Sequence, residues 1–305
     1  MRQGGAVQTA TSPAPDVDEW LDGHVSHRRV DVGPVELHVA EAGAGSPVVL
    51  LHGFPEFWYG YRRQFRPLVE AGHRVIAPDL RGYNLSDRPA GVDAYRMDLV
   101  ARDIHGLVEA ITGTDERVDV VSHDWGTTVA WLYVMQHQSR VRRFVALAGP
   151  EPWYMSRSLR WTQFRKHPYF FLFQYRFAEK LFARNDHAAV RQVFTGDERT
   201  PGAFEPSALD RYVEAFARPG ATTAALNYYR AIKRIDPSEV RALQSPLAIP
   251  VMLLLAGHDR YVDLSGAHPG EEWCRPRIET IDDSSHWLLT DAAAQVNELL
   301  LDFLG

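Results

Sequence analysis

Cysteine is nearly absent from the sequence, which has only Cys274 among its 305 residues. One thiol cannot form an internal disulfide, so we expect a protein that folds in a reducing compartment, with Cys274 as a small buried hydrophobic residue. Runs of lysine and arginine are missing too, and the formal net charge is -6. A nucleic-acid-binding protein needs a basic surface, so we exclude that class.

Long apolar runs are also missing. The longest, such as Val251–Ala256, fall far short of the roughly 18 residues that a membrane-spanning helix needs. The first 26 residues are polar, with several Pro, Gly, Ser and Thr, and they lack the apolar stretch of a secretory signal. We therefore expect a disordered tail over residues 1–26, followed by a soluble, cytoplasmic protein.

The sequence does contain an alternation of short apolar segments with longer segments of helical spacing. The expected strands are Arg28–Val32, Val35–Glu41, Val48–Leu51, Arg74–Ala77, Val118–Val121, Phe144–Leu147, Val251–Ala256 and Arg277–Ile281. The expected helices are Glu56–Glu70, Tyr95–Ile111, Gly126–His137 and Ala292–Leu304. The first two strands are expected to form a hairpin that turns at Gly33-Pro34. The alternation predicts an α/β fold with a mostly parallel sheet.

Residues 151–236 interrupt this alternation, because they have no strand pattern and are dense in aromatic residues. The aromatic residues are Trp153, Tyr154, Trp161, Phe164, Tyr169, Phe170, Phe171, Phe173, Tyr175, Phe177 and Phe182. We interpret the segment as a helical cap inserted into a core formed by residues 27–150 and 237–305. Some of these side chains pack the helices of the cap, and others, with Trp153 among the candidates, are expected to line an apolar substrate pocket.

A candidate nucleophile follows the strand Val118–Val121, in the motif Ser122-His123-Asp124-Trp125-Gly126. A small residue, a nucleophile two positions later and a glycine after two more have the spacing of a nucleophile elbow. The central residue is strained and projects from the turn, and the residues two positions away must be small so that strand and helix can approach. Ser122 stands where glycine is commoner. The alternative is that Asp124 only caps the following helix.

An aspartate at this position predicts a different reaction from a serine. The carboxylate of Asp124 is ionised at neutral pH and can displace a leaving group from an sp³ carbon without a base. The product is an ester on Asp124. A base is needed only afterwards, to activate the water that cleaves this ester.

Donors for the negative charge of that second step are expected from two backbone positions. The buried strand Val48–Leu51 continues as His52-Gly53-Phe54-Pro55-Glu56, and such a turn can offer the N–H of Phe54. The N–H of Trp125, at the start of the helix, is the expected partner. Together they would form an oxyanion hole.

The expected base is His286, which follows the strand Arg277–Ile281. Asp259 follows the preceding strand, so the order along the chain is nucleophile, acid and histidine, as this class of triad requires. Asp259 would hold the imidazole in the right tautomer and stabilise its cation. Glu151 also follows a strand of the sheet and is the alternative acid.

Three motifs, at residues 52–56, 79–87 and 122–126, resemble those of the epoxide hydrolase family, the soluble type within the α/β-hydrolases. The resemblance covers residues 25–305. It implies the α/β-hydrolase fold, with an eight-stranded mostly parallel sheet, an inserted helical cap and an active site beneath the cap at the carboxyl ends of the strands. It also implies a cis peptide bond between Phe54 and Pro55, and neither a metal nor an organic cofactor.

The resemblance further implies two tyrosines in the cap that hydrogen-bond the epoxide oxygen and then protonate it. Tyr229 matches within Leu226–Arg230, and Tyr169 matches at the start of Tyr169–Gln174, with Tyr175 and Tyr154 as alternatives. A phenol is a donor without a charge, which suits an alkoxide leaving group. The expected reaction is hydrolysis of an apolar epoxide to a vicinal diol, by a monomer or homodimer, with Phe54 and Trp125 also contacting substrate.

Two other functions use the same residues. A dehalogenase shares the aspartate nucleophile, but the similar haloalkane enzymes usually place Asn after His-Gly, where this chain has Phe54. The similar fluoroacetate enzymes carry arginines just after the nucleophile, where this chain has Trp125 and Thr128. A non-catalytic ligand-binding homologue often loses a triad member or a cap donor, and every such candidate is present here.

Overall fold

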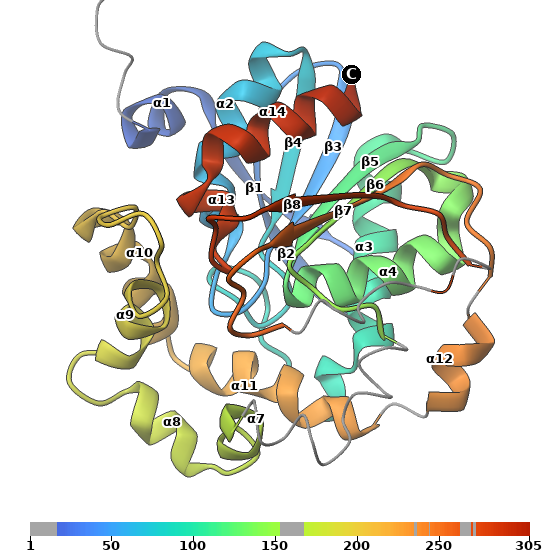
Figure 1. Cartoon of the computed structure of the whole chain (residues 1–305). Helices are drawn as coiled ribbons and strands as arrows, with labels where there is room; N and C mark the ends of the chain where they lie inside the picture. Colours follow the sequence, from blue (N-terminus) through green and yellow to red (C-terminus); the bar gives the residue numbers. More distant parts are fainter. Residues whose placement is uncertain (1–16, 153–167, 235–236, 244, 263–269, 271–272) are drawn as a thin grey trace, which may run out of the picture.

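An eight-stranded sheet forms the centre of the computed structural model, which describes residues 17–152, 168–234, 237–243, 245–262, 270 and 273–305 (Figure 1). The strands are β1 Ser26–Asp31, β2 Glu36–Gly43, β3 Ser46–Leu51, β4 His73–Pro78, β5 Val118–His123, β6 Val141–Leu147, β7 Val251–Ala256 and β8 Arg277–Ile281. Their order in the sheet is β1-β2-β4-β3-β5-β6-β7-β8. Strand β2 is antiparallel to both of its neighbours, and the other neighbouring pairs are parallel. Every expected strand overlaps an observed one, so the predicted sheet is confirmed.

Helices cover the sheet on both faces. They are α1 Val17–His24, α2 Arg62–Glu70, α3 Met97–Thr112, α4 Trp125–His137, α7 Pro168–Leu172, α8 Phe177–Phe182, α9 Ala188–Thr195, α10 Pro206–Ala217, α11 Ala221–Ala231, α12 Pro237–Leu243, α13 Leu288–Asp291 and α14 Ala293–Leu304. Helices α1, α14 and α13 gather around α2 on one face, and α3 and α12 gather around α4 on the other. None of the described helices combines the length and the apolarity that a membrane span requires.

The expected disordered tail is wrong from Val17 onwards. Residues Val17–His24 form helix α1, which buries Trp20 and Leu21, and strand β1 follows directly. The Tyr59 hydroxyl donates a hydrogen bond of 2.6 Å to Asp18 and fixes the helix to the core. The prediction failed because it was based on the average composition of the first 26 residues. This segment includes a short amphipathic helix, and its two large apolar residues, Trp20 and Leu21, become buried only in the folded protein.

Three of the four expected helices agree with the structure to within two residues at each end. The expected helix Glu56–Glu70 is different, because a short 3-10 helix, Trp58–Tyr61, precedes α2. Phe57 is extended, with φ -152° and ψ -172°. The N–H of Trp58 donates to a carboxylate oxygen of Asp79 at 3.0 Å, and this long-range bond replaces the first helical turn.

The segment between β6 and β7 contains helices α7 to α11, which we call the insert (residues 168–234). The insert lies below the sheet in Figure 1 and packs on loops that follow the carboxyl ends of the strands. The Tyr228 hydroxyl donates to the carbonyl of Arg81 beyond β4, at 2.8 Å. The ring of Phe54, beyond β3, lies 5.1 Å from that of Tyr229. The insert therefore covers the edge of the sheet where the candidate residues are expected.

The turn between β5 and α4 has the strained conformation of a nucleophile elbow. Asp124 has φ 51° and ψ -119°, a region that L-residues rarely occupy. A Cβ atom on Gly126 would lie 2.2 Å from the carbonyl oxygen of Leu51, so glycine allows α4 to approach β3. Ser122 is fully buried, and its hydroxyl donates to the carbonyl of Val145 at 3.2 Å. This hydrogen bond to β6 explains how a serine is accommodated where glycine is commoner.

Replacing Gly126 by Ala should therefore lower the free energy of unfolding by about 2 kcal/mol or more, because the added methyl group must displace the backbone of β3. Gly23 is the matched control, since a Cβ atom there meets nothing within 4 Å. Urea unfolding of both variants measures the difference. Equal stability of Gly126→Ala and Gly23→Ala would contradict the steric argument.

Candidate active site

The structure brings Asp124, His286 and Asp259 together from three separate loops. His286 Nδ1 lies 2.9 Å from Asp259 Oδ2, and His286 Nε2 lies 3.6 Å from Asp124 Oδ2. The other oxygen of Asp259 accepts the backbone N–H groups of Tyr261 and Val262, at 2.8 and 2.9 Å. These bonds fix the acid, the acid orients the imidazole, and the imidazole faces the candidate nucleophile.

The sequence left two candidate acids, Asp259 and Glu151, and their positions in the structure differ. Glu151 is buried just beyond β6, but the carboxylate that bonds to His286 Nδ1 belongs to Asp259, beyond β7. A strand end alone could not distinguish the two acids, because both strands end at the same edge of the sheet.

The surroundings of His286 favour the charged form of its imidazole. Burial lowers its pKa, but the charge and the hydrogen bond of Asp259, with the charges of Asp124 and Glu56, outweigh burial and raise the pKa to about 9. At neutral pH the site thus holds an imidazolium between two carboxylates. A charged imidazole cannot accept a proton from water. The imidazole of His286 would therefore have to lose this charge before it could act as a base.

One oxygen of Asp124 is already bound by a backbone donor. The N–H of Phe54 donates to Asp124 Oδ1 at 2.7 Å, and the Phe54–Pro55 peptide bond is cis, as the motif implied. A Cβ atom on Gly53 would lie 2.3 Å from that of Asp124, so the turn can reach the carboxylate only with glycine at this position. Trp125 is the first residue of α4, where the backbone N–H is not used within a helix. Trp125 therefore lies at the elbow itself, and Phe54 lies in the turn beyond β3 that faces it.

Tyr229, from α11, packs over Trp125 and Phe54. Its ring lies edge-on to the rings of Trp125 and Phe54, with centroids 5.0 and 5.1 Å apart. Burial raises the pKa of Tyr229 well above its ordinary value, and the charge of Asp124 raises it further. The phenol is therefore protonated and lies within the electrostatic influence of the candidate nucleophile.

Tyr169, from α7, lies beside Tyr229, with ring centroids 6.2 Å apart. Its hydroxyl donates a long hydrogen bond of 3.4 Å to the carbonyl of Tyr261. Burial raises the pKa of Tyr169, and the charges of Asp124 and then Asp259 add to the effect. Of the alternatives, Tyr175 is 59% exposed and faces away from the site, and Tyr154 lies outside the described residues, as does Trp153.

His123 and Glu56 form a buried pair behind the imidazole of His286, and the sequence had indicated no role for either residue. His123 Nε2 donates to the backbone carbonyl of His286 at 2.9 Å, and Nδ1 lies 2.9 Å from Glu56 Oε2. Burial raises the pKa of Glu56, but the charge and hydrogen bond of His123 outweigh it and leave the pKa below its ordinary value. Both residues occur in the quoted motifs, yet only the folded chain reveals that the pair holds the backbone of the base.

Tyr83 is a third phenol that the sequence reasoning missed. Its hydroxyl is buried and has no hydrogen-bond partner among the described residues. Burial raises its pKa, and the neighbouring Tyr228 and the charge of Asp124 contribute. Its ring stands edge-on to His52, with centroids 4.8 Å apart. Its place within the motif at residues 79–87 was the only sequence signal.

An apolar wall closes the site on the side of the insert. The ring of Phe54 has aromatic contacts with Phe173, Phe182 and Phe216, with centroids 5.6 to 6.0 Å apart. In the described part of the chain, no group of three or more His, Cys, Asp or Glu residues could hold a metal ion. The arrangement suits an apolar ligand that reacts with a carboxylate.

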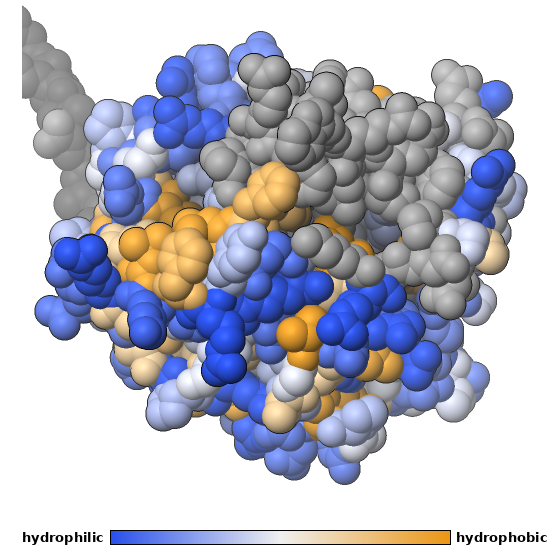
Figure 2. All heavy atoms as spheres, turned by 90° about the horizontal axis from the view of Figure 1, so that it is seen from below, coloured by the Kyte–Doolittle hydropathy of each residue, from blue (hydrophilic) through white to orange (hydrophobic). Residues whose placement is uncertain are grey.

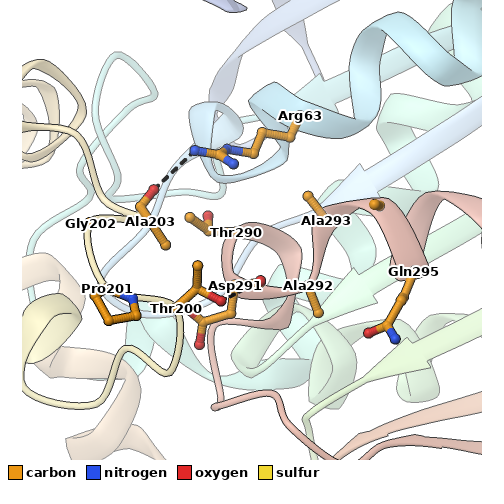
Figure 3. Close-up of a pocket in the computed structure, with 11 residues that line it drawn as sticks. Arg63, Thr200, Pro201, Gly202, Ala203, Thr290, Asp291, Ala292, Ala293 and Gln295 are labelled. Carbon is orange, nitrogen blue, oxygen red and sulfur yellow. Dashed lines mark hydrogen bonds between the residues drawn. The ribbon is translucent and has the colours of Figure 1, made fainter.

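A separate pocket of about 460 Å³ lies between α2, the loop at residues 200–203, and α13–α14 (Figure 3). None of the predicted site residues lines it. Asp291, at its floor, accepts hydrogen bonds from the N–H and the hydroxyl of Ser285, next to His286. It also accepts the N–H of Arg199 at 3.2 Å and, at its carbonyl, the hydroxyl of Thr200 at 3.1 Å. The pocket thus marks a junction between the insert and the loop that carries His286.

Known proteins share this fold over almost the whole chain. A family model described as alpha/beta hydrolase fold matches residues 46–293, so the chain belongs to the α/β-hydrolase family. The AB hydrolase superfamily protein YfhM of Bacillus subtilis is 38% identical over 290 residues, covering 93% of this chain and 99% of that protein. Epoxide hydrolase 2 of Caenorhabditis elegans is 32% identical over 290 residues, covering 92% and 80%. The crystal structure of epoxide hydrolase A from Mycobacterium thermoresistibile matches with a TM-score of 0.79 at 28% identity, over 92% of this chain and 98% of that one. The chain is thus a relative of epoxide hydrolases.

The charge of His286 gives a testable titration. By NMR, with the resonance assigned by its loss in His286→Ala, the imidazole should titrate near pH 9 and remain charged at pH 7. Asp124→Asn should lower this pKa, because it removes one of the charges that raise it. A midpoint near or below 6.5 that is unchanged in Asp124→Asn would show that the two side chains do not interact.

The same shift affects stability. Because the folded pKa of about 9 exceeds the ordinary value of 6.5, the imidazolium contributes stability that is complete below pH 6.5 and is lost as the pH rises through 9. Urea unfolding of the wild type and of His286→Ala between these pH values should show a decline that the variant lacks.

Proposed function

We propose that this protein hydrolyses an apolar epoxide to a vicinal diol through an ester on Asp124, with the insert as the cap of the site. The observation that carries the proposal is that the two carboxylate oxygens of Asp124 have different contacts. Oδ1 is held by the N–H of Phe54 at 2.7 Å, whereas Oδ2 lies 3.6 Å from His286, beyond a normal hydrogen bond. Oδ2 is therefore the oxygen that attacks.

In the first step, Oδ2 of Asp124 attacks a carbon of the three-membered ring and the carbon–oxygen bond of the ring breaks. The electron pair moves to the departing oxygen, which takes a proton from Tyr229 and accepts a hydrogen bond from Tyr169. The raised pKa values keep both phenols protonated until an alkoxide, a stronger base, is formed. The imidazolium of His286 then returns a proton to the phenolate.

The second step needs a neutral imidazole at His286, and formation of the ester favours that neutral form. Esterification removes the negative charge of Asp124, one of the charges that raise the pKa of His286, so the imidazole can remain neutral. Oriented by Asp259, it takes a proton from water, and the hydroxide adds to the ester carbon. The negative charge develops on Oδ1, which the N–H of Phe54 already contacts, and Trp125 offers a second N–H. Collapse releases the diol and restores the carboxylate and the imidazolium.

The role of the phenols can be isolated in the His286→Ala background, in which only the first step proceeds. Tyr229→Phe should slow formation of the ester by roughly 10- to 1000-fold, the usual effect of losing one acid or donor. The dissociation constant of an unreactive substrate analogue should change little. Quenched-flow mass spectrometry of the protein measures the rate.

Tyr228→Phe is the matched control, because Tyr228 is the neighbouring buried phenol but donates to the carbonyl of Arg81 at 2.8 Å. It should lower stability and leave the rate of ester formation unchanged. If Tyr228→Phe and Tyr229→Phe slow the step equally, Tyr229 only packs the site.

The two-step chemistry and the leaving group can be tested together with His286→Ala. Given an epoxide, this variant should accumulate an adduct of the full substrate mass on the peptide that contains Ser122–Gly126, because an opened ring loses no atoms. A haloalkane that reacted as in a dehalogenase would add its mass minus the hydrogen halide. Asp124→Asn is the control and should form no adduct. An adduct with a haloalkane but with no epoxide would keep the nucleophile and overturn the reaction.

A further inference from the structure

Exposed apolar side chains gather on one small part of the insert. Seven large hydrophobic side chains of the described chain are exposed, and four of them lie between residues 171 and 181. These four, which we call the α7–α8 patch, are Phe171 (40% exposed), Tyr175 (59%), Phe177 (55%) and Leu181 (42%). Figure 2 shows apolar surface collected on this side of the molecule. Clustering of this kind marks an interaction surface, whereas single exposed apolar residues do not.

The patch is the outer side of the wall of the candidate site. On the inner side of the same segment, Phe173 and Phe182 are buried, with ring centroids 5.5 Å apart, and both contact Phe54. On the outer side, the rings of Tyr175 and Phe177 stack on each other 6.0 Å apart. A segment that is apolar on both sides is typical of one buried between two partners, and among the described residues the aromatic contacts with the candidate site are made from its inner side.

Positive charge surrounds the patch, although the whole chain carries -6. Arg176, Lys180 and Arg184 are exposed around it, with Lys180 on the same face of α8 as Phe177 and Leu181. Of the two acids in this stretch, Glu179 is paired with Arg230 at 2.7 Å, and Asp186 is exposed. Aromatic and leucine side chains flanked by Lys and Arg have the chemistry of a surface that inserts among anionic lipid headgroups.

A second copy of this chain fits the patch less well. In a twofold dimer the same surface faces itself, so three cations of each copy would oppose those of the other with only Asp186 to offset them. An anionic lipid surface complements all three.

We propose that the α7–α8 patch binds this protein reversibly to membranes that contain anionic lipids. The apolar side chains enter the headgroup region, and the basic side chains contact the lipid phosphates and carboxylates. Binding by this face sets the wall of the candidate site against the lipid. The added claim that an apolar epoxide is taken from the membrane rests on the proposed function, but membrane binding itself does not.

The test is cosedimentation of the full-length protein with vesicles of phosphatidylcholine, alone or mixed with phosphatidylserine. The wild type should bind the mixed vesicles more tightly, and added salt should weaken the binding. Phe177→Ser with Leu181→Ser should weaken it about tenfold, because two apolar side chains no longer enter the lipid. Lys180→Gln should weaken it about fivefold, the usual effect of one basic residue near a charged membrane.

Ile278→Ser is the matched control, because Ile278 is 46% exposed on β8, away from the patch. It should bind like the wild type. Equal binding to both kinds of vesicle, no binding by the wild type, or equal losses in Ile278→Ser would overturn the proposal. A dimer in sedimentation velocity that the double variant disperses, without vesicle binding, would assign the patch to a second copy instead.

Hydrolysis of a water-soluble epoxide without vesicles separates the two proposals. The double variant should hydrolyse it at the wild-type rate, since neither residue touches the site. If the wild type binds vesicles but opens no epoxide, the proposed function fails and the membrane surface stands.

Discussion

The hydrogen bond from the N–H of Phe54 to Asp124 Oδ1, 2.7 Å long, joins the ends of two neighbouring strands, β3 and β5. It can form only because Gly53 leaves room for the carboxylate and Gly126 lets α4 approach the strand. The strained backbone of Asp124 is held in place by these same contacts. The bond also makes the two oxygens of the carboxylate different, and in the proposed mechanism one oxygen reacts while the other stays bound.

The sum of the charges on Asp124, His286 and Asp259 stays the same between the resting state and the ester state of the proposed cycle. Before reaction, the imidazolium of His286 lies between Asp124 and Asp259, and its pKa of about 9 reflects both. When Asp124 becomes a neutral ester, the imidazole becomes neutral too, so the sum of the three charges is unchanged, and the carboxylate of Asp259 keeps its hydrogen bonds to Tyr261, Val262 and His286. His123 and Glu56 lie behind the imidazole as a hydrogen-bonded pair, and His123 also holds the backbone carbonyl of His286.

Local patterns in the sequence predicted the sheet and the elbow well. Strands such as Val118–Val121 are short apolar runs, and the turn that follows needs small residues at fixed spacing, so both leave a local signal. Contacts between distant residues leave none. His123 meets Glu56 across 67 positions and the carbonyl of His286 across 163, and neither motif contains that information. The same limit explains the tail, where Trp20 becomes part of the core only when α2 is beside it.

The positions of the candidate acid and of the two candidate tyrosines are likewise visible only in the folded chain. Asp259 and Glu151 follow neighbouring strands, and only the direction of the imidazole distinguishes them. Tyr169 and Tyr175 are six positions apart on one short segment, yet one faces the site and the other faces outward.

The hydrogen bonds of Asp291 connect the insert to the loop that carries His286. One side chain and its own carbonyl hold Arg199 and Thr200 of the insert, and the same carboxylate holds Ser285, the residue before the base. The loop at residues 199–200 cannot move away from the core without breaking bonds at the residue that anchors the histidine loop. Asp291 therefore connects the insert to the segment that carries His286, together with the hydrogen bonds from Arg260 to Gly196 and from Tyr261 to Val193, so a displacement of the insert would disturb the position of His286.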